Sequence, residues 1–476
     1  LNIVDYDLSR YIFYSQIKQG FLYFELETHF NNINQKLDSY FISGSITEAK
    51  INLPGYGNLN DINFDFEAQD KKINISNLKI TYDDVKLFSK SLEITEDKKG
   101  IFDFKGDIEN NKILINPNLI FRLANVEQDF LSNEKVPIQS KNIFSFKLNR
   151  NKKIKNLKID SVINFDELYF SNFYKNLIFL KDGKVKYKYE DKKFTADLVS
   201  NFVFSDDLQL SNKYKKNNLS LFLESKNSQV IEAKGNISNK KTLINSNLLL
   251  SIFKLDHNLI SSENLNIGTD NDFKFRINKN KIENYVINSN INLDELKFNK
   301  KIQDLLYLKN VKSKLTFSDK FLKLDLKSYY SFINQNYNNS KNNIINLNLY
   351  KPVEGISDLE IFLQTDNNKI NTKEFKKYFK RTFIEDQIVN LNSSSSIYLS
   401  FDEAFNIVKI AAKSDIKFDN LNINYKSNIL KKYLTNYENK LKVKNPEITF
   451  EYFNDLINFQ LDGKYLLKNI EDNFFI

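Results

Sequence analysis

The thiol and imidazole side chains that often act as nucleophiles, bases or transition-metal ligands are few in this chain. Its 476 residues include no Cys and only two His, His29 and His257. Thiol nucleophiles, thiolate metal sites and disulfides are therefore excluded. Neither His has a carboxylate or a second His at the spacing that metal sites use. We expect both to have structural or solvent-facing roles, and the sequence predicts no metal site and no cofactor.

Other motifs that could carry chemistry also lack the partners they need. The carboxylate pairs Asp83-Asp84 and Asp206-Asp207 do not follow the spacing of a calcium loop, so we expect solvated turns. The serine run at 393–396 has no base nearby and no nucleophile-elbow glycines, which favours a loop. The segment LPGYGNL at 53–59 predicts a turn rather than a phosphate-binding loop. We expect no enzymatic activity.

The charge of the chain is basic but poor in arginine. Its 69 basic and 60 acidic residues give a net charge of +9, and only five of the basic residues are Arg. Proteins that read nucleic acids usually rely on the guanidinium fork of Arg. We therefore expect no nucleic-acid partner and attribute the excess of Lys mainly to compositional bias. An anionic membrane surface fits the positive charge better.

Apolar and polar residues alternate along most of the chain, as in INFDFEA at 62–68, VKYKYE at 185–190 and LKLDLKS at 322–328. A period of two residues places one set of side chains on each face of a β-strand. Clusters of Asn, Asp, Gly and Lys between these segments predict turns. The pattern indicates an antiparallel meander of many short strands, each with one apolar and one polar face.

Helical patterns are few. Residues 372–386 place Phe375, Phe379 and Phe383 on one side of an amphipathic helix that begins near Thr372. Residues 428–438 and 299–308 carry weaker helical patterns. So few short helices would leave most of the apolar face of such a sheet uncovered.

An internal repeat organises the chain. Residues 159–170 (IDSVINFDELYF) and 287–298 (INSNINLDELKF) are identical at eight of twelve positions. A further copy lies at 414–423, and a degenerate one lies at 44–51. Repeats at this spacing predict modules that contact only their neighbours. We divide the chain into a first segment, 1–158, two repeat modules, 159–286 and 287–413, and the start of another, 414–476.

Each repeat string contains an apolar pair, an acidic step such as Asp166-Glu167 or Asp294-Glu295, and a second apolar pair. The step shifts the apolar alternation by one residue, so a flat strand would turn half of these side chains into water. A β-bulge at the step would return both pairs to one face, whereas a plain turn fits the sequence equally well. The twelve side chains predicted to line one apolar groove are Ile163, Phe165, Leu168, Phe170, Ile291, Leu293, Leu296, Phe298, Ile416, Phe418, Leu421 and Ile423.

These strings, the Lys-rich apolar hairpins that follow them, and residues 381–423 resemble the AsmA-like superfamily of cell-envelope proteins, especially its long periplasmic members. The resemblance implies a mainly β fold: an elongated, repetitive antiparallel sheet curled into an open apolar groove, with a few short helices. It also implies a location in the periplasm and an inner-membrane anchor outside the printed sequence. The implied function is to carry the acyl chains of phospholipids between inner and outer membranes, with envelope proteins as partners at its ends.

Two other functions fit the same pattern. A periplasmic scaffold for outer-membrane protein biogenesis would use the exposed edges of the sheet. A surface adhesin would fold the same strands into compact β-sandwiches that bury their apolar faces against each other. Alternation alone does not separate an open sheet from a sandwich.

Overall fold

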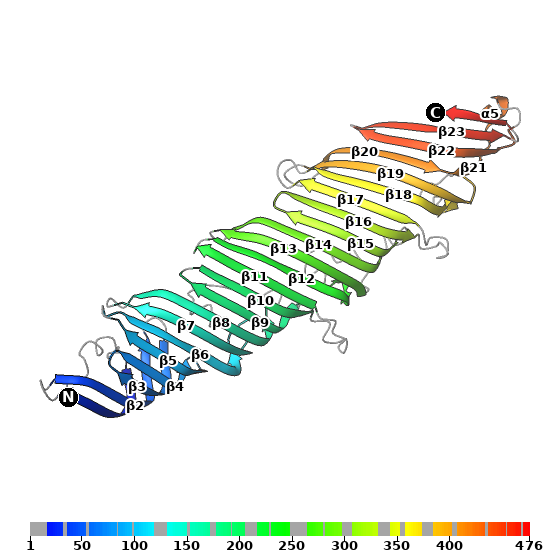
Figure 1. Ribbon diagram of the computed structural model, residues 1–476. Helices are drawn as coiled ribbons and strands as arrows, with labels where there is room; N and C mark the ends of the chain where they lie inside the picture. Colours follow the sequence, from blue (N-terminus) through cyan, green and yellow to red (C-terminus); the bar gives the residue numbers. More distant parts are fainter. Residues whose placement is uncertain are drawn as a thin grey trace. The chain divides into compact units, whose positions relative to one another are not determined.

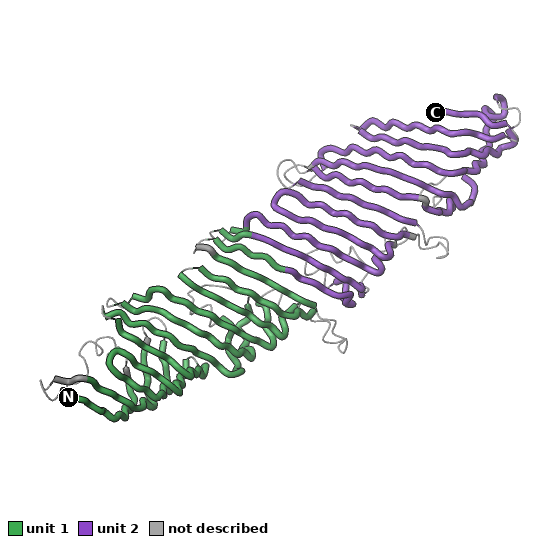
Figure 2. Tube along the Cα trace, viewed as in Figure 1, with its two compact units in different colours: residues 1–211, 216–235, 276–282 green, residues 212–215, 236–275, 283–476 purple. Residues whose placement is uncertain are grey.

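A computed structural model describes most of the chain. The described residues are 17–31, 36–53, 57–82, 84–97, 100–118, 131–149, 153–171, 178–191, 193–204, 217–227, 230–247, 264–278, 281–297, 307–331, 343–352, 358–373, 384–401, 407–433, 437–453, 455–467 and 470–476. The chain divides into two compact units (Figure 2). Unit 1 comprises residues 1–211, 216–235 and 276–282, and unit 2 comprises residues 212–215, 236–275 and 283–476.

Unit 1 contains eleven complete strands that follow one another in space as they do in sequence (Figure 1). They are β1 (Ile17–Asn31), β2 (Lys36–Leu53), β3 (Gly57–Gln69), β4 (Lys72–Tyr82), β5 (Val85–Glu96), β6 (Phe102–Ile115), β7 (Val136–Leu148), β8 (Ile154–Tyr169), β9 (Ile178–Glu190), β10 (Lys193–Phe204) and β11 (Asn217–Asn227). Each pairs with the next in antiparallel orientation.

Unit 2 has the same organisation. Its complete strands are β15 (Tyr307–Ser318), β16 (Phe321–Ser331), β17 (Ile344–Pro352), β18 (Leu359–Asn371), β19 (Ile388–Phe401), β20 (Ile407–Phe418), β21 (Asn420–Asn424), β22 (Lys440–Phe453), β23 (Leu456–Leu467) and β24 (Ile470–Phe475). Residues of both units occur in β12 (Val230–Asn245), β13 (Asn264–Asn278) and β14 (Lys281–Lys297). Pairing is again antiparallel between successive strands, with β20 and β21 both paired to β22.

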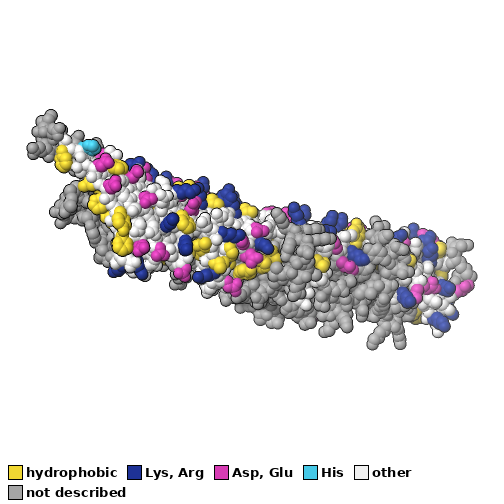
Figure 3. Space-filling view, turned by 90° about the horizontal axis from the view of Figure 1, so that it is seen from below, with side chains coloured by type: hydrophobic (Ala, Val, Ile, Leu, Met, Phe, Trp, Pro, Cys, Tyr) yellow, Lys and Arg dark blue, Asp and Glu magenta, His cyan; other side chains and the backbone are white. Residues whose placement is uncertain are grey.

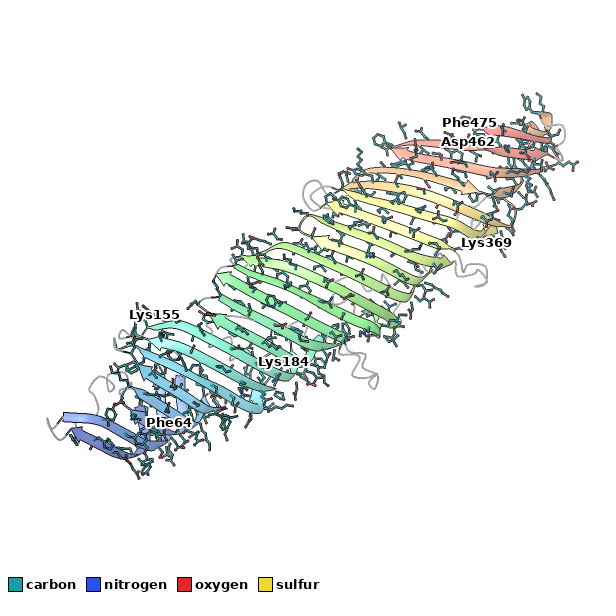
Figure 4. The ribbon with its side chains drawn as sticks, in the orientation of Figure 1. Phe64, Lys155, Lys184, Lys369, Asp462 and Phe475 are labelled. Carbon is teal, nitrogen blue, oxygen red and sulfur yellow. The ribbon has the colours of Figure 1, made fainter. Side chains whose placement is uncertain are left out.

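Within each unit the described strands form a single layer. Their extensive contacts are between neighbours in the ladder, and side chains project from both faces of the ribbon in Figure 4. Face-to-face packing of two sheets, as in the sandwich that the sequence left open, does not occur among the described strands of either unit. The single layer leaves the apolar face accessible to a partner.

The four repeat strings occupy equivalent strands. Residues 44–51 lie in β2, residues 159–169 in β8, residues 287–297 in β14, and residues 414–423 in β20 and β21. Each of these strands comes six strands after the previous one along the chain. The structural repeat is therefore six strands long.

Bulges bend the strands at positions where one strand has an extra residue. In unit 1, Ile46 pairs with Phe64 and Ala49 with Ile62, so two residues of β2 face one residue of β3. Glu48 within this bulge has a φ of 54°, and its amide donates to the Asn63 side chain at 3.0 Å. A bulge adds twist and bends its strand, so repeated bulges curl the sheet. The predicted fold class, a mainly β antiparallel sheet curled along an apolar groove with few short helices, is confirmed.

The helix predictions fare unevenly. The pattern at 428–438 forms a short helix, α5 (Asn428–Tyr433). Residues 374–383 of the predicted helix at 372–386 lie outside the described residues, and Ile384 forms a β-bridge with Ile423 instead. Residues 307–308, the end of the helix predicted at 299–308, belong to β15, and residues 299–306 are not described. Within the described ranges, no helix is both long and apolar enough to cross a membrane.

The prediction of a loop at residues 393–396 is wrong. These four serines lie in the middle of β19 and pair with β18 on one side and β20 on the other. Ser393 bonds Thr365 at 2.7 Å, and Ser395 bonds Ser414 at 2.8 Å. Serine is compatible with a strand here because its hydroxyl finds a partner on the neighbouring strand.

Candidate apolar binding face

One row of uncharged residues crosses all eleven strands of unit 1: eight carry apolar or aromatic side chains, two are Gly, and the last is Ser225. In order of strand pairing it runs Phe24, Gly44, Phe66, Ile75, Leu92, Gly106, Phe144, Ile159, Tyr189, Phe194 and Ser225. Directly paired residues share a face of the sheet. We call the face that carries this row the apolar face. No charged residue interrupts the row.

Unit 2 carries an equivalent row across nine ladder positions. It runs Ser289, Leu315, Leu324, Leu349, Ile361, Ile397, Ala412, Tyr452 and Ile457. Some of its members are well exposed, as is Ile457 at 64%. An exposed apolar surface of this continuity usually marks an interaction site.

The opposite face, which we call the polar face, carries charged and polar side chains at the positions next to those of the apolar row. In unit 1 its adjacent row runs Glu25, Ser43, Glu67, Asn74, Glu93, Lys105, Ser145, Lys158, Glu190 and Lys193. Cross-strand ion pairs such as Lys158–Glu190 link it. Figure 3 shows hydrophobic, basic and acidic side chains intermixed on the side of the molecule that it presents. The two faces therefore offer different chemistry to a partner.

Buried clusters sit where the bulges bend the apolar face. Ala49, Ile62 and Leu78 form one cluster on β2, β3 and β4 of unit 1. Each directly follows a residue in the left-handed conformation, namely Glu48, Asp61 and Asn77. Sequence reasoning missed these positions. An Asn or Asp inside a strand pattern, followed by an apolar residue, is the signal that could have found them.

The first repeat string places its groove residues in and just after β8. Phe165 is buried, whereas Ile163, Leu168 and Phe170 are half-buried. The Phe165 ring covers Gly183 of β9, where an added Cβ would lie 1.9 Å from the Phe165 Cζ atom. Glycine at this position therefore makes room for the ring.

In the second string, the two apolar pairs meet on one cluster. Leu293 and Leu296 both pack against Leu308, Val311 and Tyr330. Val311 is only 2% exposed. This packing confirms that the pairs on either side of Asp294-Glu295 lie on one face. Ile291 is half-buried on the same strand, and Phe298 lies outside the described residues.

The third string behaves in the same way. Phe418 of β20 and Ile423 of β21 pack on the buried cluster of Val389, Leu421 and Val443. Ile416 is half-buried and pairs with Ile448 of β22. The chain bends at Asp419, whose carboxylate accepts hydrogen bonds from the amide and side chain of Asn390 at 3.0 and 2.8 Å.

The acidic steps Asp166-Glu167 and Asp294-Glu295 are not turns, because β8 and β14 run through them. Nor do they interrupt pairing with the following strand: Leu293 pairs with Val311 and Glu295 with Lys309. That register places Asn310, with a φ of 50°, opposite Asp294. The register shift appears one strand later, where two residues of β15 face one of β16. The strand that follows the acidic step thus carries a bulge that the sequence did not predict.

A buried serine closes this bulge in two repeats. Ser200 Oγ donates to the carbonyl oxygens of Lys181 and Asn201 at 3.0 and 2.9 Å. Ser328 Oγ makes the equivalent bonds to Lys309 and Tyr329 at 3.0 and 2.8 Å. These serines satisfy carbonyl groups that the bulge removes from the ladder.

Removing the Ser328 hydroxyl should therefore destabilise unit 2. We expect Ser328→Ala to lower the free energy of unfolding by about 1–2 kcal/mol, because buried carbonyl groups lose a donor. The exposed Ser396 on the same sheet offers a control, and Ser396→Ala should change stability by less than about 0.5 kcal/mol. Urea unfolding of the two variants measures the difference. Equal effects would show that Ser328 does not hold the bulge.

Charged groups on the polar face act through ordinary ion pairs. The Lys241 Nζ atom lies 2.7 Å from Asp294 Oδ1, and this hydrogen bond lowers the pKa of the Asp294 carboxyl. Among the described residues, no group of three or more His, Cys, Asp or Glu side chains could hold a metal ion. His29 lies exposed on β1, and His257 is not described. The apolar face is the feature on which a function can be argued.

No family model, curated protein or solved structure matches this chain. Function must therefore be argued from the two faces of the sheet.

Proposed function

We propose that this protein is a non-enzymatic carrier of phospholipid acyl chains, which lie along the apolar face while the headgroups stay in water at its margin. The observation that carries the proposal is the unbroken apolar row in each unit. Eleven strands at ~4.8 Å spacing give the unit 1 row a length of about 48 Å. A single layer leaves this row without a covering sheet, and acyl chains would remove it from water at roughly 25 cal/mol per Å².

On the resemblance to AsmA-like envelope proteins, we also propose that the protein acts in the periplasm, between inner and outer membranes, with an inner-membrane anchor. Residues Ile163, Phe165, Leu168 and Phe170 and their repeat equivalents would then contact lipid at the bends of the groove. The composition supports the non-enzymatic part of the proposal, because the chain has no Cys thiol and only two His imidazoles.

Purification of the protein tests this proposal directly. We expect phospholipid to co-elute with it and to be identified by mass spectrometry of the organic extract. A detergent-stripped sample should then take up phospholipid from vesicles. A monodisperse preparation that carries no lipid and takes up none would rule the proposal out.

The edge of unit 1 supports a second candidate, a scaffold for outer-membrane protein biogenesis. In the described part of the chain, β1 pairs only with β2, and its Phe21, Leu22, Tyr23 and Phe24 are 56–62% exposed. A free edge with apolar side chains can accept a strand from another protein. Photo-crosslinking from position 22 to protein, with no lipid at position 144, would favour this function over lipid transfer.

A further inference from the structure

Three pairs of lysines face each other directly across neighbouring described strands. They are Lys147–Lys155, Lys312–Lys327 and Lys444–Lys464. Like charges that lie opposite each other on one face of a sheet destabilise the pairing. Each pair therefore needs a nearby anionic group.

One of the three pairs has a carboxylate between its two ammonium groups, whereas the Asp103 carboxylate opposite Lys147 lies 3.4 Å from the Lys105 Nζ atom. Glu471 of β24 lies between Lys444 and Lys464, with N–O distances of 2.6 and 3.4 Å. Hydrogen bonds and charge from both lysines lower the pKa of Glu471. Lys147 pairs on its other side with Asp103 of β6.

The pair Lys312–Lys327 has no such partner in the described part of the chain. Lys312 pairs on its other side with Asn292, and Lys327 pairs with Asn346. The nearest acids are committed elsewhere. Asp294 binds Lys241 at 2.7 Å and Asn266 at 2.5 Å. Asp325 binds Lys323 at 3.3 Å and Asn348 at 2.6 Å.

These two lysines line a hollow of about 910 Å³ within unit 2, together with Lys240, Lys241, Asn292 and Asn310. Its size falls in the range of ligand sites. Four lysines and three asparagines line it with only two acidic residues, Asp270 and Asp294. The lining therefore carries a net positive charge and offers more hydrogen-bond donors than acids.

We propose that Lys312 and Lys327 form the centre of a phosphate-binding site on the polar face of unit 2. A bound phosphate would occupy the place that Glu471 takes between Lys444 and Lys464. Its oxygens can accept from both ammonium groups and from the flanking Asn amides, which a single carboxylate cannot do as fully. Lys312 and Lys327 lie on the face opposite Leu315 and Leu324 of the unit 2 row, and the hollow also touches Leu293 and Val311 of the apolar cluster.

Calorimetric titration of the full chain with inorganic pyrophosphate and flotation with phosphatidylglycerol vesicles test the proposal. We expect Lys312→Gln/Lys327→Gln to weaken binding at least tenfold, and Lys314→Gln, on the same face, to change it less than twofold. Pyrophosphate binding that is weakened in the double variant would show that a soluble phosphate is sufficient to fill the site. If the vesicles bind in this site-dependent way and pyrophosphate does not bind, the phosphate is that of a lipid headgroup. If neither probe binds, or if the control weakens binding equally, the proposal fails.

A charge reversal provides a second readout. We expect Lys312→Glu to raise the urea midpoint of the unliganded protein, because it converts the repulsive pair into an attractive one. Pyrophosphate at constant ionic strength should raise the midpoint of the wild-type protein and leave that of the variant unchanged. A variant that is less stable, or that still responds to pyrophosphate, would contradict the site.

Discussion

The substitution Phe144→Asp is expected to reduce co-purified phospholipid at least tenfold. Phe144 lies in the middle of the unit 1 apolar row, between Gly106 and Ile159. A carboxylate there would have to lose its hydration beside an acyl chain, with no cation on the apolar face to pair with it. The free-energy cost of dehydrating this carboxylate would stop acyl chains from sliding along the row. Mass spectrometry of bound lipid and a vesicle-to-vesicle transfer assay measure the loss.

The neighbouring residue supplies the control. Ser145→Asp introduces the same charge one residue along β7, on the polar face, where Ser145 pairs with Lys105 and Lys158. Lipid content should stay near that of the wild-type protein. Circular dichroism should show that both variants keep their strands. Equal lipid loss in both variants, or none in Phe144→Asp, would remove the apolar row from the lipid path.

The second large effect is expected from Gly183→Ala. The new methyl group would overlap the Phe165 ring, whose nearest atoms lie 1.9–2.4 Å from the ideal Cβ position. Relief requires Phe165 to leave its buried site or β9 to move, and overpacking of this kind costs about 2–3 kcal/mol. Urea unfolding should show this loss in unit 1.

A double-mutant cycle checks its cause. In a Phe165→Leu background, the Gly183→Ala substitution should cost less than about 1 kcal/mol, because the smaller side chain leaves room for the methyl group. Additive effects would show that the alanine acts on the backbone rather than on the ring. Gly57→Ala would not serve as a further control, because Gly57 has a φ of 102°, which strains any residue that carries a Cβ.

The sequence was sufficient to predict the fold class and the apolar face of each strand, because apolar and polar residues alternate along the strands. It also identified Leu293 and Leu296 as members of one face. The sequence could not predict which residues form a row across neighbouring strands. That Phe144 lies between Gly106 and Ile159 depends on the register of three strands, and bulges change that register by one residue at a time.

Particular errors have physical causes. The serines at 393–396 resemble a loop in composition, yet both neighbours of β19 supply hydrogen-bond partners. The bulge at Asn310 was not predicted, although an Asn is one of the few residues that readily adopt the left-handed conformation that this residue has. The Lys312–Lys327 pair depends on the register of the hairpin formed by β15 and β16, in which residues 312–317 pair with residues 322–327.

The six-strand repeat has a consequence for how such chains change in length. Six antiparallel strands make three hairpins, so each repeat string enters its strand in the same direction as the one before it. Gain or loss of one strand would reverse every later strand. Gain or loss of a hairpin would preserve both strand direction and the side on which the apolar residues lie. Because strands contact mainly their sequence neighbours, a duplicated hairpin would disturb only the two junctions beside it. The architecture therefore allows the length of the apolar row to evolve in steps of two strands.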